Sequence, residues 1–169
     1  SKSGNTFRST LYQDDVFSLT DYYQDQGYAF AEIQPMTLID DERLEVDMRF
    51  NIVKGEEIYI NRINILGNIR TRDKVIRREL RFAEGDRFSG SKLKESQRRL
   101  KNTTYFQNLD MKIAKTDDPK KVNMDVTIEE KPTGSLSAGV GYSTDEKVMV
   151  SGSISQENFF GTGRKVFLD

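Results

Sequence analysis

Residues 122–129 read Val-Asn-Met-Asp-Val-Thr-Ile-Glu, and every second side chain in this stretch is apolar. Because side chains alternate between the two faces of a β-strand, this pattern predicts a strand that is buried on one face only. Leu109, Met111 and Ile113 alternate in the same way, and the turn-forming residues Asp117-Asp118-Pro119 separate the two stretches. The sequence therefore predicts a β-hairpin whose first strand covers about residues 108–115.

The residues before this hairpin complete a longer unit. A β-branched strand is predicted over 58–66, and helices are predicted over about 72–81 and 90–102. The side chains that these helices turn inward are those of Val75, Ile76, Leu80, Leu93 and Leu100. The unit thus runs strand, helix, helix, strand, strand.

The first third of the chain repeats the end of this unit. A helix is predicted over about 11–26, ending at Gly27, and strands over about 30–36 and 43–53. The pair Asp40-Asp41 recurs as Asp117-Asp118, 77 positions later. We therefore expect an internal repeat whose first copy lacks its opening strand, so that the chain begins inside a domain.

The character of the sequence changes after Pro132. Apolar residues alternate with glycine or serine from Leu136 to Tyr142, and a similar alternation covers Val148 to Ile154. This pattern suits strands with lipid on one face and a polar lumen on the other, although a soluble hairpin packed on the second repeat remains an alternative. A further strand is expected at 166–168, and a loop at 143–147. Two or three strands cannot close a barrel, so we expect only the start of one.

The composition excludes several kinds of active site. The 169 residues include no histidine and no cysteine, which removes thiol catalysis, disulfides and Ser-His-Asp triads. Gly85-x4-Gly90-Ser91-Lys92 carries the lysine and serine of a phosphate-binding loop in the wrong order. The acidic turns lack the spaced ligands of a calcium loop. We therefore expect no catalytic residue, no metal site and no cofactor.

Charge is distributed unevenly although the net charge is only −1. Residues 5–57 hold 4 Lys or Arg against 12 Asp or Glu, whereas residues 70–101 hold 12 against 5. Such asymmetry suggests a partner. The basic stretch could be a solvated helical face, a docking surface for an acidic protein, or a nucleic-acid surface, but it lacks a recognisable nucleic-acid-reading motif.

Several motifs resemble the BamA family of bacterial outer-membrane protein assembly factors. Ile63–Asn68, Val75–Leu80 and Glu84-Gly85-Asp86 resemble the last POTRA repeat of that family, and Gly27–Phe30 resembles a turn of the penultimate one. Glu130–Ser135, Gly139–Ser143 and Asn158–Gly163 resemble the junction with its barrel and the first barrel strands.

The resemblance implies an α+β fold of tandem POTRA (βααββ) repeats, the first incomplete, followed by the start of an antiparallel transmembrane β-barrel. The implied domains are a truncated penultimate repeat over 1–55, the last repeat over 56–132 and the first barrel strands over 133–169. Each repeat would carry a three-stranded sheet covered by two helices.

The function implied by the resemblance is insertion of β-barrel precursors into the bacterial outer membrane, without enzyme activity. The repeats would lie in the periplasm, and the full-length barrel would lie in the outer membrane. The implied partners are unfolded outer-membrane proteins and lipoprotein subunits of the assembly complex, with no nucleic acid. Alternatives are a related two-partner-secretion or organelle transporter, or a soluble basic adaptor that binds an acidic macromolecule through 70–101.

Three sets of residues are candidates for these contacts. An exposed sheet edge can accept an extended precursor strand through its main chain, which predicts strand addition at 30–36 and 108–115; the residues are Ile33, Leu109, Met111 and Ile113. The resemblance implies a docking segment for partner lipoproteins at Arg77, Arg78, Arg81 and Glu84. It also implies a weakly held barrel seam strand at Leu136, Ala138, Gly139, Val140 and Gly141.

Overall fold

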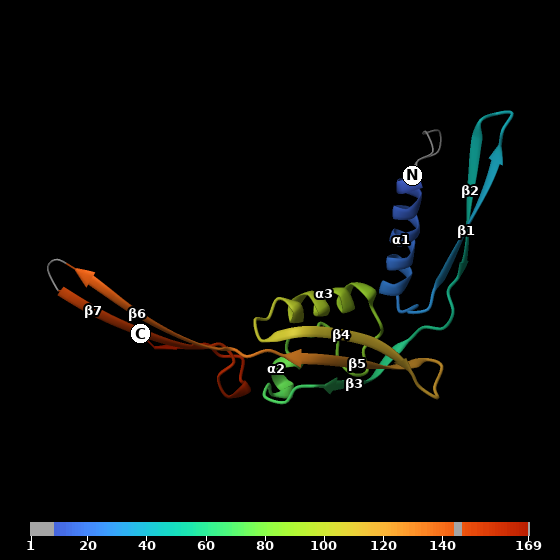
Figure 1. Cartoon of the computed structure of the whole chain (residues 1–169). Helices are drawn as coiled ribbons and strands as arrows, with labels where there is room; N and C mark the ends of the chain where they lie inside the picture. The colour runs from blue at the N-terminus through green and yellow to red at the C-terminus, as the bar shows by residue number, and fades with distance from the viewer. Residues whose placement is uncertain (1–8, 144–146, 169) are drawn as a thin grey trace. The chain divides into compact units, whose positions relative to one another are not determined.

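The computed structural model describes residues 9–143 and 147–168 (Figure 1). Strand β5 (Lys121–Glu130) lies in the middle of a three-stranded sheet of order β3-β5-β4, between β3 (Tyr59–Leu66) and β4 (Phe106–Lys115). Its apolar residues Val122, Met124, Val126 and Ile128 are all buried. The predicted alternation is therefore confirmed, and it belongs to the central strand.

Two helices complete this repeat, which has the predicted βααββ order. Helix α2 (Asp73–Arg77) buries Val75 and Ile76, and helix α3 (Gly90–Lys101) buries Ser96 and Leu100. Helix α2 is shorter than the predicted 72–81. The N–H groups of Glu79 and Leu80 donate hydrogen bonds to the carbonyls three residues earlier, so the chain continues after α2 in 3-10-type turns. Leu80 and Phe82, in and after these turns, are buried in the core.

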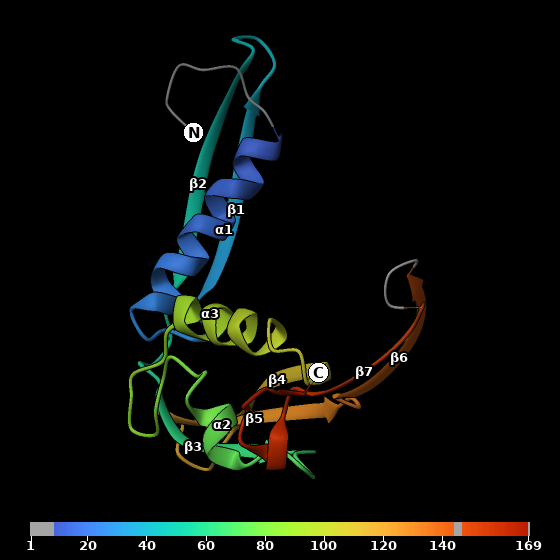
Figure 2. The same ribbon diagram turned by 90° about the vertical axis from the view of Figure 1, so that its left-hand side faces the viewer.

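The preceding repeat contributes helix α1 (Ser9–Asp25) and a two-stranded antiparallel sheet of β1 (Glu32–Asp40) and β2 (Glu45–Val53). Figure 2 shows α1 running alongside this hairpin, and the rings of Tyr12 and Phe50 stack with centroids 6.3 Å apart. Gly27 follows α1 with a φ of 95°, which confirms the predicted helix stop. The absence of an opening strand, which would lie before residue 1, stays a prediction, and residues 1–8 lie outside the described residues.

The hairpin turn differs from the prediction at Leu44. The carboxylate of Asp40 accepts hydrogen bonds from the N–H groups of Glu42 and Arg43 and fixes the turn. Leu44 has a φ of 54° and is 89% exposed, so it belongs to the turn and not to the apolar face. Strand β2 therefore begins at Glu45, and β1 extends to Asp40 instead of ending near 36.

The last segment forms a second antiparallel sheet of order β6-β7-β8. Its strands are β6 (Gly134–Ser143), β7 (Lys147–Gln156) and β8 (Val166–Leu168), with a short 3-10 helix η1 (Phe159–Gly161) between the last two. The predicted strands are confirmed, whereas the middle of the predicted loop, residues 144–146, lies outside the described residues.

We predict that truncating a core residue beside β5 costs far more than truncating a loop residue of the same type. Ile76 is fully buried and Ile69 is 91% exposed. Replacing Ile76 with Ala should lower the free energy of unfolding by about 2–5 kcal/mol, and replacing Ile69 with Ala by about 0.5 kcal/mol or less. Chemical denaturation followed by circular dichroism measures both; equal losses would contradict this packing.

Candidate functional site

The two edges of the last repeat's sheet differ in how much main chain they leave unpaired. At the outer edge of β3, the N–H of Ile60 donates to the carbonyl of Asp86, and the N–H of Gly85 donates to the carbonyl of Ile60, so this edge is partly covered. The order β3-β5-β4 leaves β4 with a neighbour on one side only, within the described part of the chain. Leu109, Met111 and Ile113 are half-buried, and Ile113 packs against the buried cluster of Ala29, Ile58, Phe88 and Val122. Ile113 therefore supports the strand from the core side, and the outer edge of β4 offers N–H and C=O groups.

Charged residues occupy the opposite face of β4. Asp110 and Lys112 are exposed, and the Lys112 ammonium lies 2.8 Å from the Asp110 carboxylate. The hydrogen bond to this carboxylate, together with its charge, raises the pKa of Lys112. Charged side chains on an edge strand discourage uncontrolled pairing with other chains.

Ile33 lies in a different environment. It is half-buried in β1, opposite Ile52 of β2. The two strands form a sheet of their own, so both have one unpaired edge within the described residues. The structure therefore does not bring Ile33 together with the three β4 residues into a single site.

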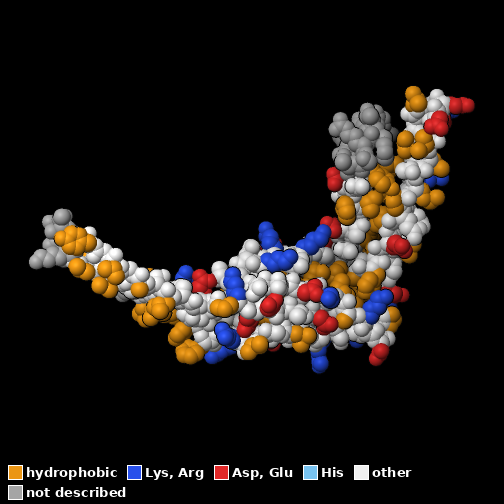
Figure 3. Space-filling view, in the orientation of Figure 1, with side chains coloured by type: hydrophobic (Ala, Val, Ile, Leu, Met, Phe, Trp, Pro, Cys, Tyr) orange, Lys and Arg blue, Asp and Glu red, His pale blue; other side chains and the backbone are white. Residues whose placement is uncertain are grey.

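The predicted seam strand β6 divides its residues between two faces. The register pairs Leu136 with Ile154, Ala138 with Gly152 and Val140 with Val150 on one face. Gly139 and Gly141 lie on the other, opposite Ser151 and Met149. Leu136, Val140 and Val150 are exposed, and Figure 3 shows apolar side chains along the hairpin. One face of the sheet is thus a continuous apolar surface, and β6 is at its edge.

The predicted docking residues lie on α2 and on the segment that follows it. Arg77 pairs with Asp73 at 3.0 Å, and Arg78 lies 3.4 Å from Glu79. All four side chains are exposed. Glu84 differs from the others because its carboxylate accepts a 2.9 Å hydrogen bond from the N–H of Ile63 in β3. It therefore also holds the loop against the sheet.

Many cations of the basic stretch 70–101 already have acidic partners. Besides the pairs of Arg77 and Arg78, the ion pairs are Arg87–Glu57, Lys92–Asp86, Lys94–Asp21, Arg98–Glu95 and Arg99–Glu79. Seven of the twelve cations are thus in pairs. These contacts weaken the case for a broad polyanion-binding face.

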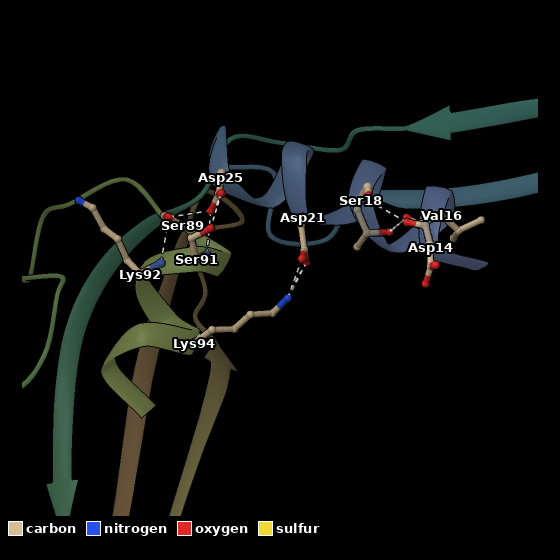
Figure 4. Close-up of polar contacts among 10 residues, drawn as sticks. Asp14, Val16, Ser18, Asp21, Asp25, Ser89, Ser91, Lys92 and Lys94 are labelled. Atoms are coloured by element: carbon tan, nitrogen blue, oxygen red, sulfur yellow. Dashed lines mark hydrogen bonds and ion pairs between the residues drawn. The ribbon is translucent and has the colours of Figure 1, made fainter. Parts of the chain in front are cut away.

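One functional feature that the sequence did not predict is a carboxylate that joins α1 to α3. Asp25 accepts a 2.8 Å hydrogen bond from the N–H of Ser91, one of 2.8 Å from the Ser89 hydroxyl, and another from the Ser91 hydroxyl (Figure 4). Ser89 itself caps α3 by accepting from the N–H of Lys92. Asp25 thus binds the amino end of α3, where the free N–H groups favour a negative charge. We refer to these contacts as the Asp25 cap.

A second such feature joins the last repeat to the loop after β7. Glu130 accepts from the N–H groups of Arg70 (2.9 Å) and Thr71 (2.7 Å). The buried Asn158 side chain donates to the Thr71 hydroxyl at 2.7 Å and accepts from the N–H of Gly163 at 2.8 Å. We refer to this network as the Glu130 junction.

Both carboxylates favour their charged state. Burial by itself raises the pKa of Asp25, but hydrogen bonds from Ser91 and Ser89 and the charge of Lys94 outweigh it and lower the pKa. Burial likewise raises the pKa of Glu130, and hydrogen bonds from Thr71 and Arg70 again reverse the direction.

Residues 9–143 and 147–168 contain no group of three or more acidic side chains placed to hold a metal ion. Over the same ranges, no helix has both the length and the apolar character needed to cross a membrane.

Comparison with known proteins identifies relatives over almost the whole chain. The POTRA family model, described as a surface antigen variable number repeat, matches residues 1–55 and 58–131. The outer membrane protein assembly factor BamA of Nitratidesulfovibrio vulgaris is 43% identical over 96% of this chain and 20% of its own length. BamA of Neisseria meningitidis serogroup B is 38% identical over 84% of this chain and 18% of its own. The chain thus spans about a fifth of these relatives.

A solved structure agrees with the fold. The crystal structure of BamA from Haemophilus ducreyi lacking POTRA domains 1–3 superposes with a TM-score of 0.87. The alignment covers 99% of this chain and 32% of that one, at 29% identity.

We predict that the Asp25 cap stabilises the protein only while Asp25 is ionised. Asp25→Ala, which removes the acceptor oxygens, should lower the free energy of unfolding at pH 7 by about 1 kcal/mol, as for other helix caps. The folded pKa is lowered, so the stabilisation is complete above the ordinary value of 3.8 and is lost as the pH falls through the folded pKa. Thermal unfolding of both proteins between pH 2 and 7 tests this, and a difference that grows on acidification would contradict it.

Proposed function

The chain belongs to the POTRA repeat family, and from this premise we propose that it is the membrane-proximal part of an outer-membrane protein assembly factor. Residues 1–55 and 56–132 would be its last two periplasmic repeats, and residues 133–169 the first strands of its barrel. The relatives that carry the name BamA support this assignment. The whole protein would reside in the bacterial outer membrane and assemble β-barrel proteins there.

The proposed mechanism is addition of a precursor strand to the free edge of β4. The observation that carries it is the sheet order, in which β4 is an edge strand, and Ile113 of β4 packs against the core. Because main-chain hydrogen bonds do not depend on side-chain identity, one strand edge can accept clients of varied sequence. The edge of β1 at Ile33 would add a second acceptor in the preceding repeat. No covalent step or cofactor is needed.

Strand β6 would then act as the seam of the barrel. Its residues Gly139 and Gly141 leave little side-chain surface for packing, so pairing at this edge is expected to be weak. The apolar face that includes Leu136, Ala138 and Val140 would meet lipid. A client strand that leaves β4 could pair next with β6, because both offer the same kind of unpaired main chain.

Lipoprotein subunits of the assembly complex would dock on the segment after α2. Arg77 at the end of α2 and Arg78 and Arg81 after it are exposed, and Glu84 holds the loop through its hydrogen bond from the N–H of Ile63. Exposed cations of this kind orient an acidic partner and speed its association.

We predict that a precursor strand crosslinks to β4 and not to the opposite edge of the sheet. Asp110→Cys on β4 and Arg62→Cys on β3 place single thiols at exposed strand positions in a chain that has no other cysteine. Docking raises the effective thiol concentration towards about millimolar, so a cysteine-tagged peptide copying the last strand of an outer-membrane barrel protein should form a disulfide at least about tenfold faster with Asp110→Cys.

The two thiols act as matched controls for each other. A faster reaction at Arg62→Cys would indicate that the precursor strand adds to β3 and not to β4. Equal rates at the two positions would show that the peptide does not add to either edge selectively, and would contradict the mechanism.

We predict that reversing the charge at Arg81 weakens docking of the lipoprotein subunits by about tenfold, because a charge complementary to the partner is replaced by a repulsive one. Lys112→Glu, which changes charge by the same amount on β4, serves as the control. Calorimetry or surface binding measures both variants against the purified lipoproteins. The proposal that lipoproteins dock at Arg81 would be contradicted if Arg81→Glu bound them as tightly as the unmodified protein while Lys112→Glu bound them more weakly.

A further inference from the structure

The loop after β3 and the loop after β7 expose large apolar side chains. Ile69, in the loop between β3 and α2, is 91% exposed, and Leu66 at the end of β3 is 54% exposed. Phe160 and Phe159, in the loop after β7, are 77% and 39% exposed. Single exposed apolar residues are common, but four of them on two adjoining loops form a patch, and such patches mark interaction sites.

The two loops are held against each other by their backbones. The N–H of Arg72 donates a 3.0 Å hydrogen bond to the carbonyl of Gly161. Gly161 has a φ of 67°, and a side chain there would collide with the carbonyl of Arg70. Together with the Glu130 junction, these contacts fix the relative position of the loops, so their apolar tips form one surface.

Phe160 is exposed although its backbone conformation is an unfavourable one. Its φ of 49° lies in the left-handed region, which is uncommon for an aromatic residue. The two phenylalanine rings meet edge to face, with centroids 4.3 Å apart. A ring kept at the surface at some conformational cost suggests a function outside the core.

The same loops are strongly basic. Residues 66–72 and 159–165 include four cations, Arg70, Arg72, Arg164 and Lys165, and no acidic residue. Nearby carboxylates are already engaged: Asp73 with Arg77, Glu130 with the N–H groups of Arg70 and Thr71, and Glu157 with Lys165 at 3.3 Å. Because Lys165 is paired with Glu157, Arg70, Arg72 and Arg164 supply the positive charge that accompanies the apolar tips.

We propose that these two loops form an interfacial patch that rests in the headgroup region of a bilayer containing anionic phospholipid. Aromatic and aliphatic tips would enter the boundary of the acyl chains, and the cations would meet lipid phosphates. The position of the patch supports this occupant over a soluble acidic protein. Gly134 pairs with Gln156, so the loop after β7 begins at the end of the hairpin whose apolar face is proposed to meet lipid.

This inference rests on the proposed function, since a membrane partner presupposes the barrel strands. It adds that the last repeat itself touches the membrane, through Ile69 and its neighbours. The Glu130 junction would then keep the repeat at a fixed position beside the bilayer.

The test uses the full chain, with an environment-sensitive fluorophore on single cysteines at position 69 or 160. Asn102→Cys, at an exposed position after α3, is the control site, and Val150→Cys reports on the hairpin. With vesicles of phosphatidylethanolamine and phosphatidylglycerol, probes at 69 and 160 should shift to the blue, and the probe at 102 should not. Arg70→Gln and Arg72→Gln should each weaken the response roughly fivefold.

Probes at 69 and 160 that keep their aqueous emission would overturn the inference, and a response at 150 in the same experiment would leave the membrane hairpin intact. An equal shift with soluble polyglutamate or an oligonucleotide at matched charge would also overturn it, because the partner would then be a soluble polyanion. A response at 69 and 160 without one at 150 would support the patch and count against the hairpin. Strand addition at β4 is tested separately by the crosslinking rates.

Discussion

The structure of the last repeat depends on the burial of β5. A three-stranded sheet has one central strand, and only β5 carries an unbroken row of buried apolar residues, from Val122 to Ile128. Its main chain is paired on both sides, so β3 and β4 must be edges. The exposed main chain that the proposed function requires is therefore a consequence of how the core is packed.

Two carboxylates extend this local order to the neighbouring segments. Asp25 binds the amino end of α3, and Glu130, at the end of β5, binds the loop that contacts Asn158. Each accepts hydrogen bonds from main-chain N–H groups, and each has a lowered pKa. Charged at neutral pH, they add polar contacts between segments that are far apart in the sequence. A repeat that accepts client strands would benefit from such fixed connections on both sides.

The periodic parts of the fold could be predicted from the sequence, and the contacts between distant segments could not. The alternation in β5, the stop at Gly27 and the βααββ order follow from local patterns. The positive φ of Leu44 does not, because the apolar alternation favours a strand from residue 43, whereas the hydrogen bonds to Asp40 extend the turn to Arg43. Asp25 lies 66 positions from Ser91, and Thr71 lies 87 from Asn158, so no local pattern signals these pairs. Glu84 matched a family motif, but its bond to Ile63 required the structure.

The most direct test of strand addition at β4 is an amide NMR titration of the chain with the barrel-strand peptide. A peptide of the same sequence, N-methylated at alternate residues, serves as the control because it cannot complete a ladder of main-chain hydrogen bonds. Shifts confined to Phe106–Lys115 and its neighbours, absent with the methylated peptide, are the predicted result. Equal shifts with both peptides, or shifts across 70–101 that an oligonucleotide reproduces, would contradict the account.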